Sequence, residues 1–114
     1  MSETVTAYIG IGSNLGDRAG IIRSAISDLD AVDEVRVITQ SRVIETEPMG
    51  TPGQGKYLNG AVGVVTTLEP RGLLDVCLEV ERKHGRDRTQ EARWGPRTLD
   101  LDLLLYGRSF PSRA

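Results

Sequence analysis

The chain has little of the residues that mark several classes of protein. Its single cysteine, Cys77, excludes an internal disulfide framework and a cysteine-based zinc site, and favours a reducing compartment. No apolar run approaches the length of a membrane helix, about 20 residues, and the first residues lack the basic flank of a signal peptide. Aromatic residues make up only 4% of the chain and its net charge is -2, which argues against a nucleic-acid partner. We therefore expect a cytoplasmic protein with no membrane or nucleic-acid partner.

The length of the chain suits one domain. It has 114 residues, of which 39% are hydrophobic and 26% charged. A chain of this size buries roughly 65% of the surface that its unfolded form exposes, so one two-layer core can hold it together without a metal or a disulfide. We expect residues 1–114 to form a single domain.

Hydrophobic periodicity divides the chain into six elements. Alternating or β-branched segments predict strands at 4–12, 35–46, 57–67 and 98–106. Apolar residues at helical spacing predict two helices, one beginning near Asp17 and one after Thr66. The alternation in 35–46 shifts phase near Gln40, which a β-bulge could absorb. The order β-α-β-β-α-β predicts an α+β fold, the ferredoxin-like sandwich, with a four-stranded antiparallel sheet and both helices on one face.

The second predicted helix carries signals at both ends. Thr66 and Glu69 have the spacing of a capping box, and Pro70 suits a first turn. Basic residues at 82–84 suit the negative end of the helix dipole, and Gly85 can form a left-handed cap. The predicted buried stripe consists of four apolar residues, Leu73, Leu74, Cys77 and Val80.

Asp100 and Asp102 lie two residues apart in the last predicted strand. Both side chains should therefore point to one face of the sheet, while Leu101, Leu103 and Leu105 point to the other. Adjacent like charges repel, and a cation between them would remove that repulsion. Oxygen ligands on a strand suit Mg²⁺, which takes one or two carboxylates together with waters and substrate phosphates. A solvated edge strand, whose charges discourage aggregation, is the alternative interpretation.

Residues 82–97 are basic within an otherwise acidic chain. Two acidic residues stand there against six basic ones, which are Arg82, Lys83, Arg86, Arg88, Arg93 and Arg97. Guanidinium groups bind phosphate oxygens in a bidentate manner, so arginines just before a carboxylate pair indicate a metal–nucleotide site. A solvated basic loop that balances acidic helices is the alternative.

Other features have both a functional and a structural interpretation. Residues 10–16 join a strand to a helix and could hold a phosphate, but their G-x-G-x-x-x-G spacing fits neither a dinucleotide fingerprint nor a Walker loop, which favours a turn and helix cap. His84 and Cys77 are interpreted as a helix-end cation and a core thiol. Trp94 either belongs to a loop that closes over a ligand or anchors its loop to the core.

Residues 93–102, RWGPRTLDLD, closely resemble the signature of the 6-hydroxymethyl-7,8-dihydropterin pyrophosphokinases of folate biosynthesis. Residues 12–16, 57–59 and 81–88 also match in order and approximate spacing, and the resemblance covers about residues 6–107. It implies a transferase that moves the terminal pyrophosphate of ATP to the pterin hydroxymethyl group, releases AMP and needs two Mg²⁺ ions.

The resemblance also implies a role for individual residues. Asp100 and Asp102 match the magnesium ligands, while Arg93 and Trp94 match the mobile catalytic loop. The implied ATP contacts are Glu81, Arg86, Arg88, Arg93 and Arg97. The implied pterin contacts are Asn14, Thr46, Met49, Tyr57 and Asn59.

The chain departs from the family pattern at several positions. Glu47-Pro48 stands where the family often has two prolines, Leu78 stands where a glutamine often faces ATP, and the loop before Trp94 is one residue longer. Members continue past the last strand with a segment that supplies a histidine, an arginine and an aromatic residue to the site, whereas only residues 108–114 follow here.

Three functions are therefore open. The chain is a C-terminally shortened but active pyrophosphokinase, or it is a relative that binds nucleotide or pterin without turnover, or it is a ferredoxin-like regulatory or RNA-binding module. Its oligomeric state is expected to be a monomer, or a homodimer that covers exposed sheet.

Overall fold

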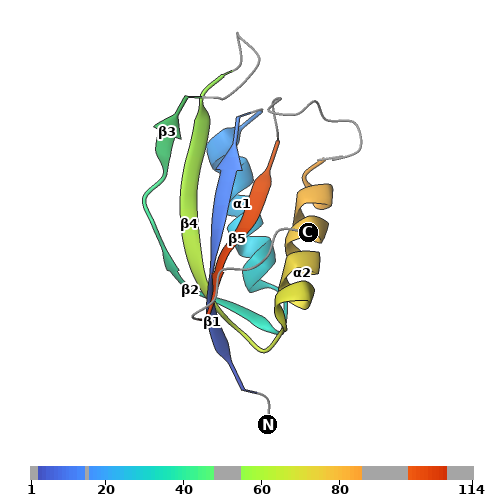
Figure 1. The fold of residues 1–114 in the computed structure, drawn as a ribbon. Coiled ribbons are helices and arrows are strands. Elements are labelled where there is room, and N and C mark those ends of the chain that lie inside the picture. Colours follow the sequence, from blue (N-terminus) through green and yellow to red (C-terminus); the bar gives the residue numbers. More distant parts are fainter. Residues whose placement is uncertain (1–2, 15, 48–54, 86–97, 108–114) are drawn as a thin grey trace.

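An antiparallel sheet and two helices make up the fold (Figure 1), seen in a computed structural model that describes residues 3–14, 16–47, 55–85 and 98–107. The elements are β1 (Val5–Ser13), α1 (Arg18–Asp30), β2 (Val35–Gln40), β3 (Ile44–Thr46), β4 (Tyr57–Thr66), α2 (Pro70–Lys83) and β5 (Asp100–Tyr106). Neither helix has the length and hydrophobicity to cross a bilayer, as far as the described part of the chain goes.

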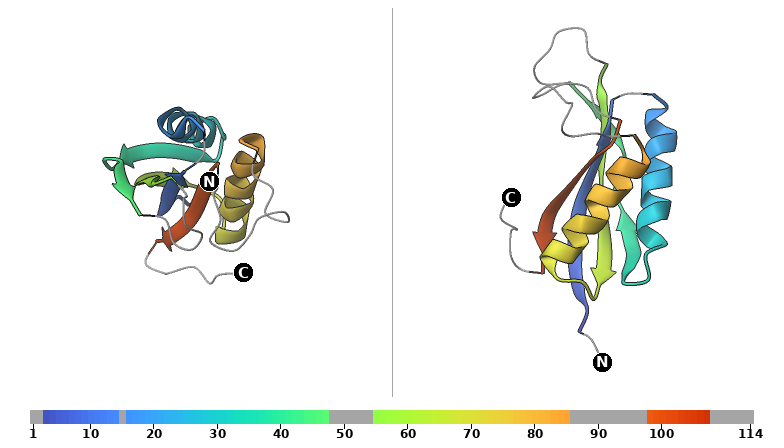
Figure 2. Two further views of the ribbon diagram at one scale, coloured as in Figure 1. Left: turned by 90° about the horizontal axis from the view of Figure 1, so that it is seen from above. Right: turned by 90° about the vertical axis from the view of Figure 1, so that its right-hand side faces the viewer.

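The strand order identifies the topology. The sheet runs β2-β4-β1-β5 with every neighbour antiparallel, and β3 also pairs with β4. Both helices lie on one face of this sheet (Figure 2). Since β2 and β3 occupy the same edge, they together take the place of one strand, and the predicted α+β ferredoxin-like fold is confirmed with five strands instead of four.

The strand predicted at 35–46 is interrupted by Ser41. Its hydroxyl Oγ accepts a hydrogen bond from the Ala61 amide of β4 at 2.8 Å, a donor that a continuous ladder would pair with a backbone carbonyl. The register of β2 on β4 also shifts between Val37 and Thr39. The change of phase near Gln40 therefore corresponds to an irregular register and a break.

The core lies between the sheet and the helices. Its sheet side is formed by buried apolar residues that include Ala7, Ile9, Ile11, Val62, Val64 and Leu101. On α2, Leu73, Cys77 and Val80 are buried as predicted, which confirms Cys77 as a core thiol. Leu74 is only half-buried, and Glu81 takes a place on the buried face instead.

The helix ends confirm one predicted cap and correct another. Asp17 caps α1 by accepting a hydrogen bond from the Gly20 amide at 3.1 Å, which supports the turn-and-cap interpretation of residues 10–16. The capping box predicted for α2 is wrong, because Glu69 is the N-cap and Thr66 ends β4. The Thr66 hydroxyl donates to the Glu34 carbonyl at 2.7 Å. Gly85, with φ +84°, takes the predicted left-handed conformation after α2.

A register shift in β5 corrects the prediction for Leu105. Leu103 pairs with Ile9, but Leu105 pairs with Tyr8, so β5 carries one extra residue at this point. The side chains beyond the shift therefore exchange faces. Tyr106 packs against the core in place of Leu105, and its hydroxyl donates to the Leu68 carbonyl at 2.6 Å.

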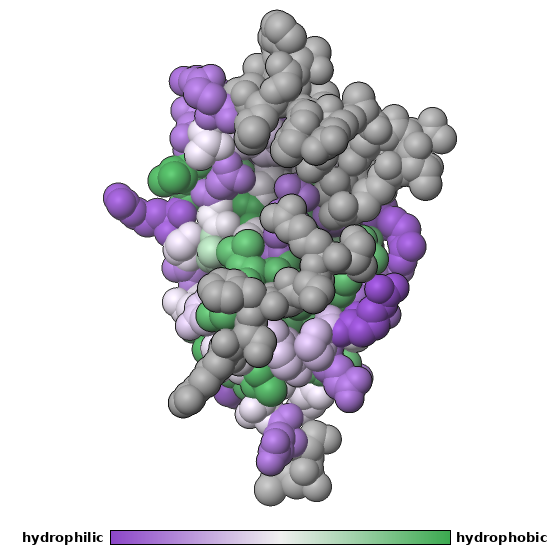
Figure 3. Space-filling view, in the orientation of Figure 1, coloured by the Kyte–Doolittle hydropathy of each residue, from purple (hydrophilic) through white to green (hydrophobic). Residues whose placement is uncertain are grey.

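Among the described residues, no helix covers the face of the sheet opposite α1 and α2, which we call the open face. In the space-filling view of this face, apolar surface lies among polar side chains (Figure 3). Tyr8, Ile44 and Leu104 are 40%, 57% and 47% exposed there, which is unusual for residues of this size. The strand residues of the predicted site lie on this open face, namely Thr46, Tyr57, Asn59, Asp100 and Asp102.

Candidate active site

One end of the sheet collects most of the predicted site residues. The end of β1 lies there beside the beginnings of β4 and β5, together with β3 (Figure 1). Asn14 follows β1, Thr46 ends β3, Tyr57 begins β4 and Asp100 begins β5. The topology thus brings together residues that are far apart in the sequence.

A single cross-strand row connects the two groups of predicted ligand contacts. Asp100 of β5 pairs with Gly12 of β1, and Gly12 pairs with Asn59 of β4. Adjacent strands lie about 4.8 Å apart, so the Asp100 and Asn59 backbones are separated by about 10 Å. No side chain stands between them, because residue 12 is a glycine.

Gly12 leaves space for the side chain of Asn59 in its present position. A Cβ atom at position 12 would lie 2.6 Å from Asn59 Oδ1, shorter than real Cβ contacts, and 3.6 Å from Tyr57 Cδ1. The glycine therefore lets the Asn59 amide lie across β1, toward the side on which Asp100 stands.

The predicted pterin contacts form a connected group. The Asn59 amide nitrogen donates a hydrogen bond to Thr46 Oγ1, and Thr46 pairs with Tyr57 in the ladder. Asn14 is buried and its amide nitrogen donates to the Gly55 carbonyl at 3.2 Å, which ties the end of β1 to the segment before β4. Four of the five predicted residues therefore lie at this end, and the fifth, Met49, is outside the described residues.

Asp100 and Asp102 occupy the open face, as predicted. They pair with Gly12 and Gly10 of β1, and Asp100 is half-buried while Asp102 is exposed. The alternating residues Leu99 and Leu101 are buried in the core and hold the strand in place. The two carboxylates share one face, and their hard oxygen atoms are the ligands that Mg²⁺ prefers. Within the described ranges, no group of three or more His, Cys, Asp or Glu forms a further metal site.

Glu81 has a contact that the sequence analysis missed. Its side chain is only 2% exposed, and Oε2 accepts a hydrogen bond from the Leu101 amide at 2.8 Å. The signal was present in the sequence, because Leu73, Cys77 and Glu81 follow one another at intervals of four residues on the buried face of a helix. The carboxylate therefore lies against β5, between the two aspartates along the strand.

Arg18 is a residue of this end of the sheet that sequence reasoning did not identify. Its guanidinium donates to Glu45 Oε2 at 3.2 Å and to the Lys56 carbonyl at 2.7 Å. It thereby links the first residue of α1 to β3 and to the residue before β4. Local sequence patterns could not predict this contact, because its partners are 27 and 38 residues away.

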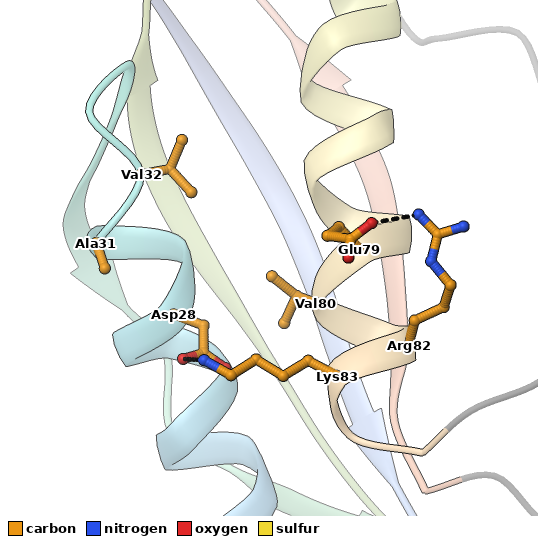
Figure 4. A pocket seen from close by; sticks show the side chains of 7 residues that line it. All are labelled: Asp28, Ala31, Val32, Glu79, Val80, Arg82 and Lys83. Atoms are coloured by element: carbon orange, nitrogen blue, oxygen red, sulfur yellow. Dashed lines mark hydrogen bonds and ion pairs between the residues drawn. The ribbon is translucent and has the colours of Figure 1, made fainter.

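A cleft between the two helices is separate from this site. It has a volume of about 460 Å³ and is lined by Asp28, Ala31, Val32, Glu79, Val80, Arg82 and Lys83, none of which is a predicted site residue. Figure 4 shows Lys83 extending from α2 to Asp28 on α1. Lys83 Nζ donates a hydrogen bond to Asp28 Oδ1 at 3.0 Å. Its position on the helical side of the sheet places it away from Asp100 and Asp102.

Asp28 explains the position of His84. The His84 ring nitrogen Nε2 lies 2.9 Å from Asp28 Oδ2, and His84 is the C-cap of α2, which supports its structural interpretation. Burial alone would raise the pKa of Asp28, but hydrogen bonds from Lys83 and His84 and their positive charge outweigh it and lower this pKa.

The predicted arginine contacts to phosphate and the predicted catalytic-loop tryptophan fall on a part of the chain that the structure does not describe. They are Arg86, Arg88, Arg93, Trp94 and Arg97.

Fold and site together define a ferredoxin-like domain with a carboxylate pair and a polar amide group on one open sheet face. A family model described as 7,8-dihydro-6-hydroxymethylpterin-pyrophosphokinase (HPPK) matches residues 8–114. The chain belongs to this family, as its signature predicted.

Curated relatives agree with the family match. The chain is 46% identical to the 2-amino-4-hydroxy-6-hydroxymethyldihydropteridine pyrophosphokinase of Methylorubrum extorquens, over 88% of this chain and 62% of that protein. It is 45% identical to the Bacillus subtilis protein of the same name, over 90% of this chain and 60% of that protein. The Pseudomonas putida protein of that name is 42% identical, over 90% of this chain and 83% of that protein. The chain thus spans about three-fifths of the length of the first two.

Proposed function

We propose that the chain transfers pyrophosphate from ATP to 6-hydroxymethyl-7,8-dihydropterin and releases AMP. The observation that carries this proposal is the cross-strand row in which Asp100, Gly12 and Asn59 lie side by side. It supports the proposal because a metal–phosphate subsite at Asp100 and a pterin subsite at Asn59 would then share one face, about 10 Å apart. Membership of the family and the names of the relatives support the same reaction.

In this proposal Asp100 and Asp102 hold magnesium, with two ions expected from the family resemblance. Bound Mg²⁺ neutralises charge on the triphosphate and makes the phosphorus easier to attack. The carboxylates need to be held in place for this task, and β5 provides that through its ladder with β1 and the buried Leu99 and Leu101.

Asn59, Thr46 and Tyr57 bind the pterin in the proposed complex. An asparagine amide both donates and accepts hydrogen bonds, which suits the amide-like edge of a pterin ring. Asn14 supports this subsite by fixing the segment before β4 through the Gly55 carbonyl.

The chemical step forms one bond and breaks another. The hydroxymethyl oxygen bonds to the β-phosphorus of ATP, the bond from that phosphorus to the AMP oxygen breaks, and the hydroxyl proton passes to solvent. Transfer of this kind depends mainly on positioning and charge neutralisation, so it needs no dedicated base. The roles of Arg86, Arg88, Arg93, Trp94 and Arg97 as phosphate and loop contacts, and of Met49 at the pterin, belong to the proposal.

Release of AMP from ATP, measured with and without hydroxymethyl-dihydropterin, tests the proposed function. We expect AMP only when the pterin and Mg²⁺ are both present. Asp100→Asn and Asp102→Asn should each abolish turnover, and Asp33→Asn, at an exposed position outside the site, is the matched control. Magnesium-dependent ATP binding without AMP would reject turnover, and full activity in both site variants would reject the metal assignment.

A further inference from the structure

We propose that Glu81 is a positioning residue that holds the carboxylate pair of β5 in its binding geometry. The inference rests on the proposed function, because it assigns Glu81 a task in that same site. It differs from the nucleotide contact that family resemblance implies for this residue.

The position of Leu101 makes the contact specific. β5 is the edge of the path β2-β4-β1-β5, so among the described strands it pairs with β1 alone. Amides along a strand point alternately to its two sides. Since the Leu101 amide donates to Glu81 Oε2, the amides of Asp100 and Asp102 on either side of it point toward β1. Glu81 thus holds the outer side of β5 at the residue between the two aspartates.

The burial of Glu81 indicates that this contact matters. A carboxylate is costly to bury unless it is hydrogen-bonded. Its stripe neighbours Leu73 and Cys77 are apolar and fully buried, so packing alone would be satisfied by an apolar residue at position 81. With 2% of its surface exposed, the side chain is also poorly placed to contact a ligand in solution.

The restraint on β5 matters for metal binding because Mg²⁺ tolerates little variation in its coordination geometry. This ion requires nearly ideal octahedral geometry, so its ligands must be held within narrow limits. Leu99 and Leu101 fix β5 toward the core and β1 fixes its inner side. Glu81 adds a restraint on the outer side, through the hydrogen bond that its carboxylate accepts from the Leu101 amide.

Two substitutions separate positioning from nucleotide contact. Glu81→Leu removes the acceptor of the Leu101 amide and keeps an apolar side chain of suitable size. Glu81→Gln removes the charge and keeps a carbonyl oxygen that can accept the same hydrogen bond. Glu79→Leu and Glu79→Gln, at an exposed position of the same helix, are the matched controls.

The measurements are the Mg²⁺ concentration for half-maximal rate, the KM for ATP at saturating Mg²⁺, and Mn²⁺ binding in the presence of a methylene analogue of ATP. Loss of a group hydrogen-bonded directly to a metal ligand weakens metal binding about 10- to 100-fold. Because Glu81 acts through the Leu101 backbone, we expect Glu81→Leu to weaken both metal readouts by up to about 10-fold, the lower end of that range. Glu81→Gln should recover most of the loss, while KM for ATP changes little. The Leu101 amide should exchange faster with solvent in Glu81→Leu only.

The outcomes are distinguishable. If the unsubstituted chain releases no AMP, the proposed function fails, whatever the variants do. If it is active and Glu81→Leu keeps the wild-type Mg²⁺ requirement, positioning is overturned. A raised KM for ATP in both variants, with no change in Mn²⁺ binding, would overturn it in favour of nucleotide contact. Should Glu81→Leu fail to fold, the KM for ATP of Glu81→Gln decides: a value close to wild type is what positioning predicts, and a raised value with unchanged Mn²⁺ binding overturns it.

Discussion

The contact between Gly12 and Asn59 allows a quantitative test of the proposed pterin subsite. In Gly12→Ala the new Cβ would lie 2.6 Å from Asn59 Oδ1, where ordinary contacts begin at 3.4 Å. The Asn59 amide must therefore move by about 0.8 Å or the strands must separate. Either movement changes its hydrogen bond to Thr46 and its orientation toward a bound ring.

Two effects follow from this displacement. Overpacking of a well-filled site usually lowers the free energy of unfolding by about 1–3 kcal/mol. Loss of the donated and the accepted hydrogen bond to the pterin, at about 1 kcal/mol each, weakens binding by about 10- to 100-fold. We expect Gly12→Ala to show both changes.

Isothermal titration with hydroxymethylpterin and urea denaturation provide the two measurements. Gly10→Ala is the matched control, because its Cβ would meet Leu104 Cδ1 at an ordinary 3.4 Å on the same strand and face. In the Asn59→Ala background the clash is absent, so the double variant should have the same unfolding free energy as Asn59→Ala alone. Unchanged pterin affinity in Gly12→Ala would refute the assignment of Asn59 to the pterin.

Two further predictions concern stability. The pKa of Asp28 is lowered from its ordinary value of 3.8, so its ionised form stabilises the fold above that pH and the contribution is lost as the pH falls through the lowered pKa. Between about pH 5 and about pH 3, the unfolding free energy measured by urea denaturation should therefore fall less for Asp28→Asn than for wild type. An equal fall in the two proteins would contradict this. Leu73 is fully buried, so Leu73→Ala should lower the unfolding free energy by about 2–5 kcal/mol. Half-buried Leu78→Ala is its control, and equal losses for the two variants would show that Leu73 is not at the centre of the core.

Local patterns in the sequence predicted most of the elements. The alternation around Asp100 and Asp102 predicted their shared face, and Gly85 predicted the end of α2, because both depend on neighbours within a few residues. Thr66 misled for the same reason. Its spacing from Glu69 fits a capping box, but in the fold its hydroxyl donates to the Glu34 carbonyl, which is distant in the sequence.

Features that depend on pairing between strands could not be predicted from spacing. The face of Leu105 depends on a register shift opposite Tyr8 and Ile9, and the break in 35–46 depends on a hydrogen bond between Ser41 and β4. The same holds for the site. Asn59 and Asp100 were each identified from the motif that contains them, but their common row through Gly12 is a property of the sheet.

That row has a consequence for how the site tolerates change. The separation of the two proposed subsites is set by one intervening strand, so insertions between β3 and β4 or between α2 and β5 would leave it unaltered. A slip of one residue in the pairing of β5 with β1 would have the opposite effect, because it would turn both aspartates toward the core. Variation in loop length is therefore expected to leave the spacing of the two proposed subsites intact, whereas the registers of β4 and β5 on β1 should be invariant in any form that keeps the proposed site.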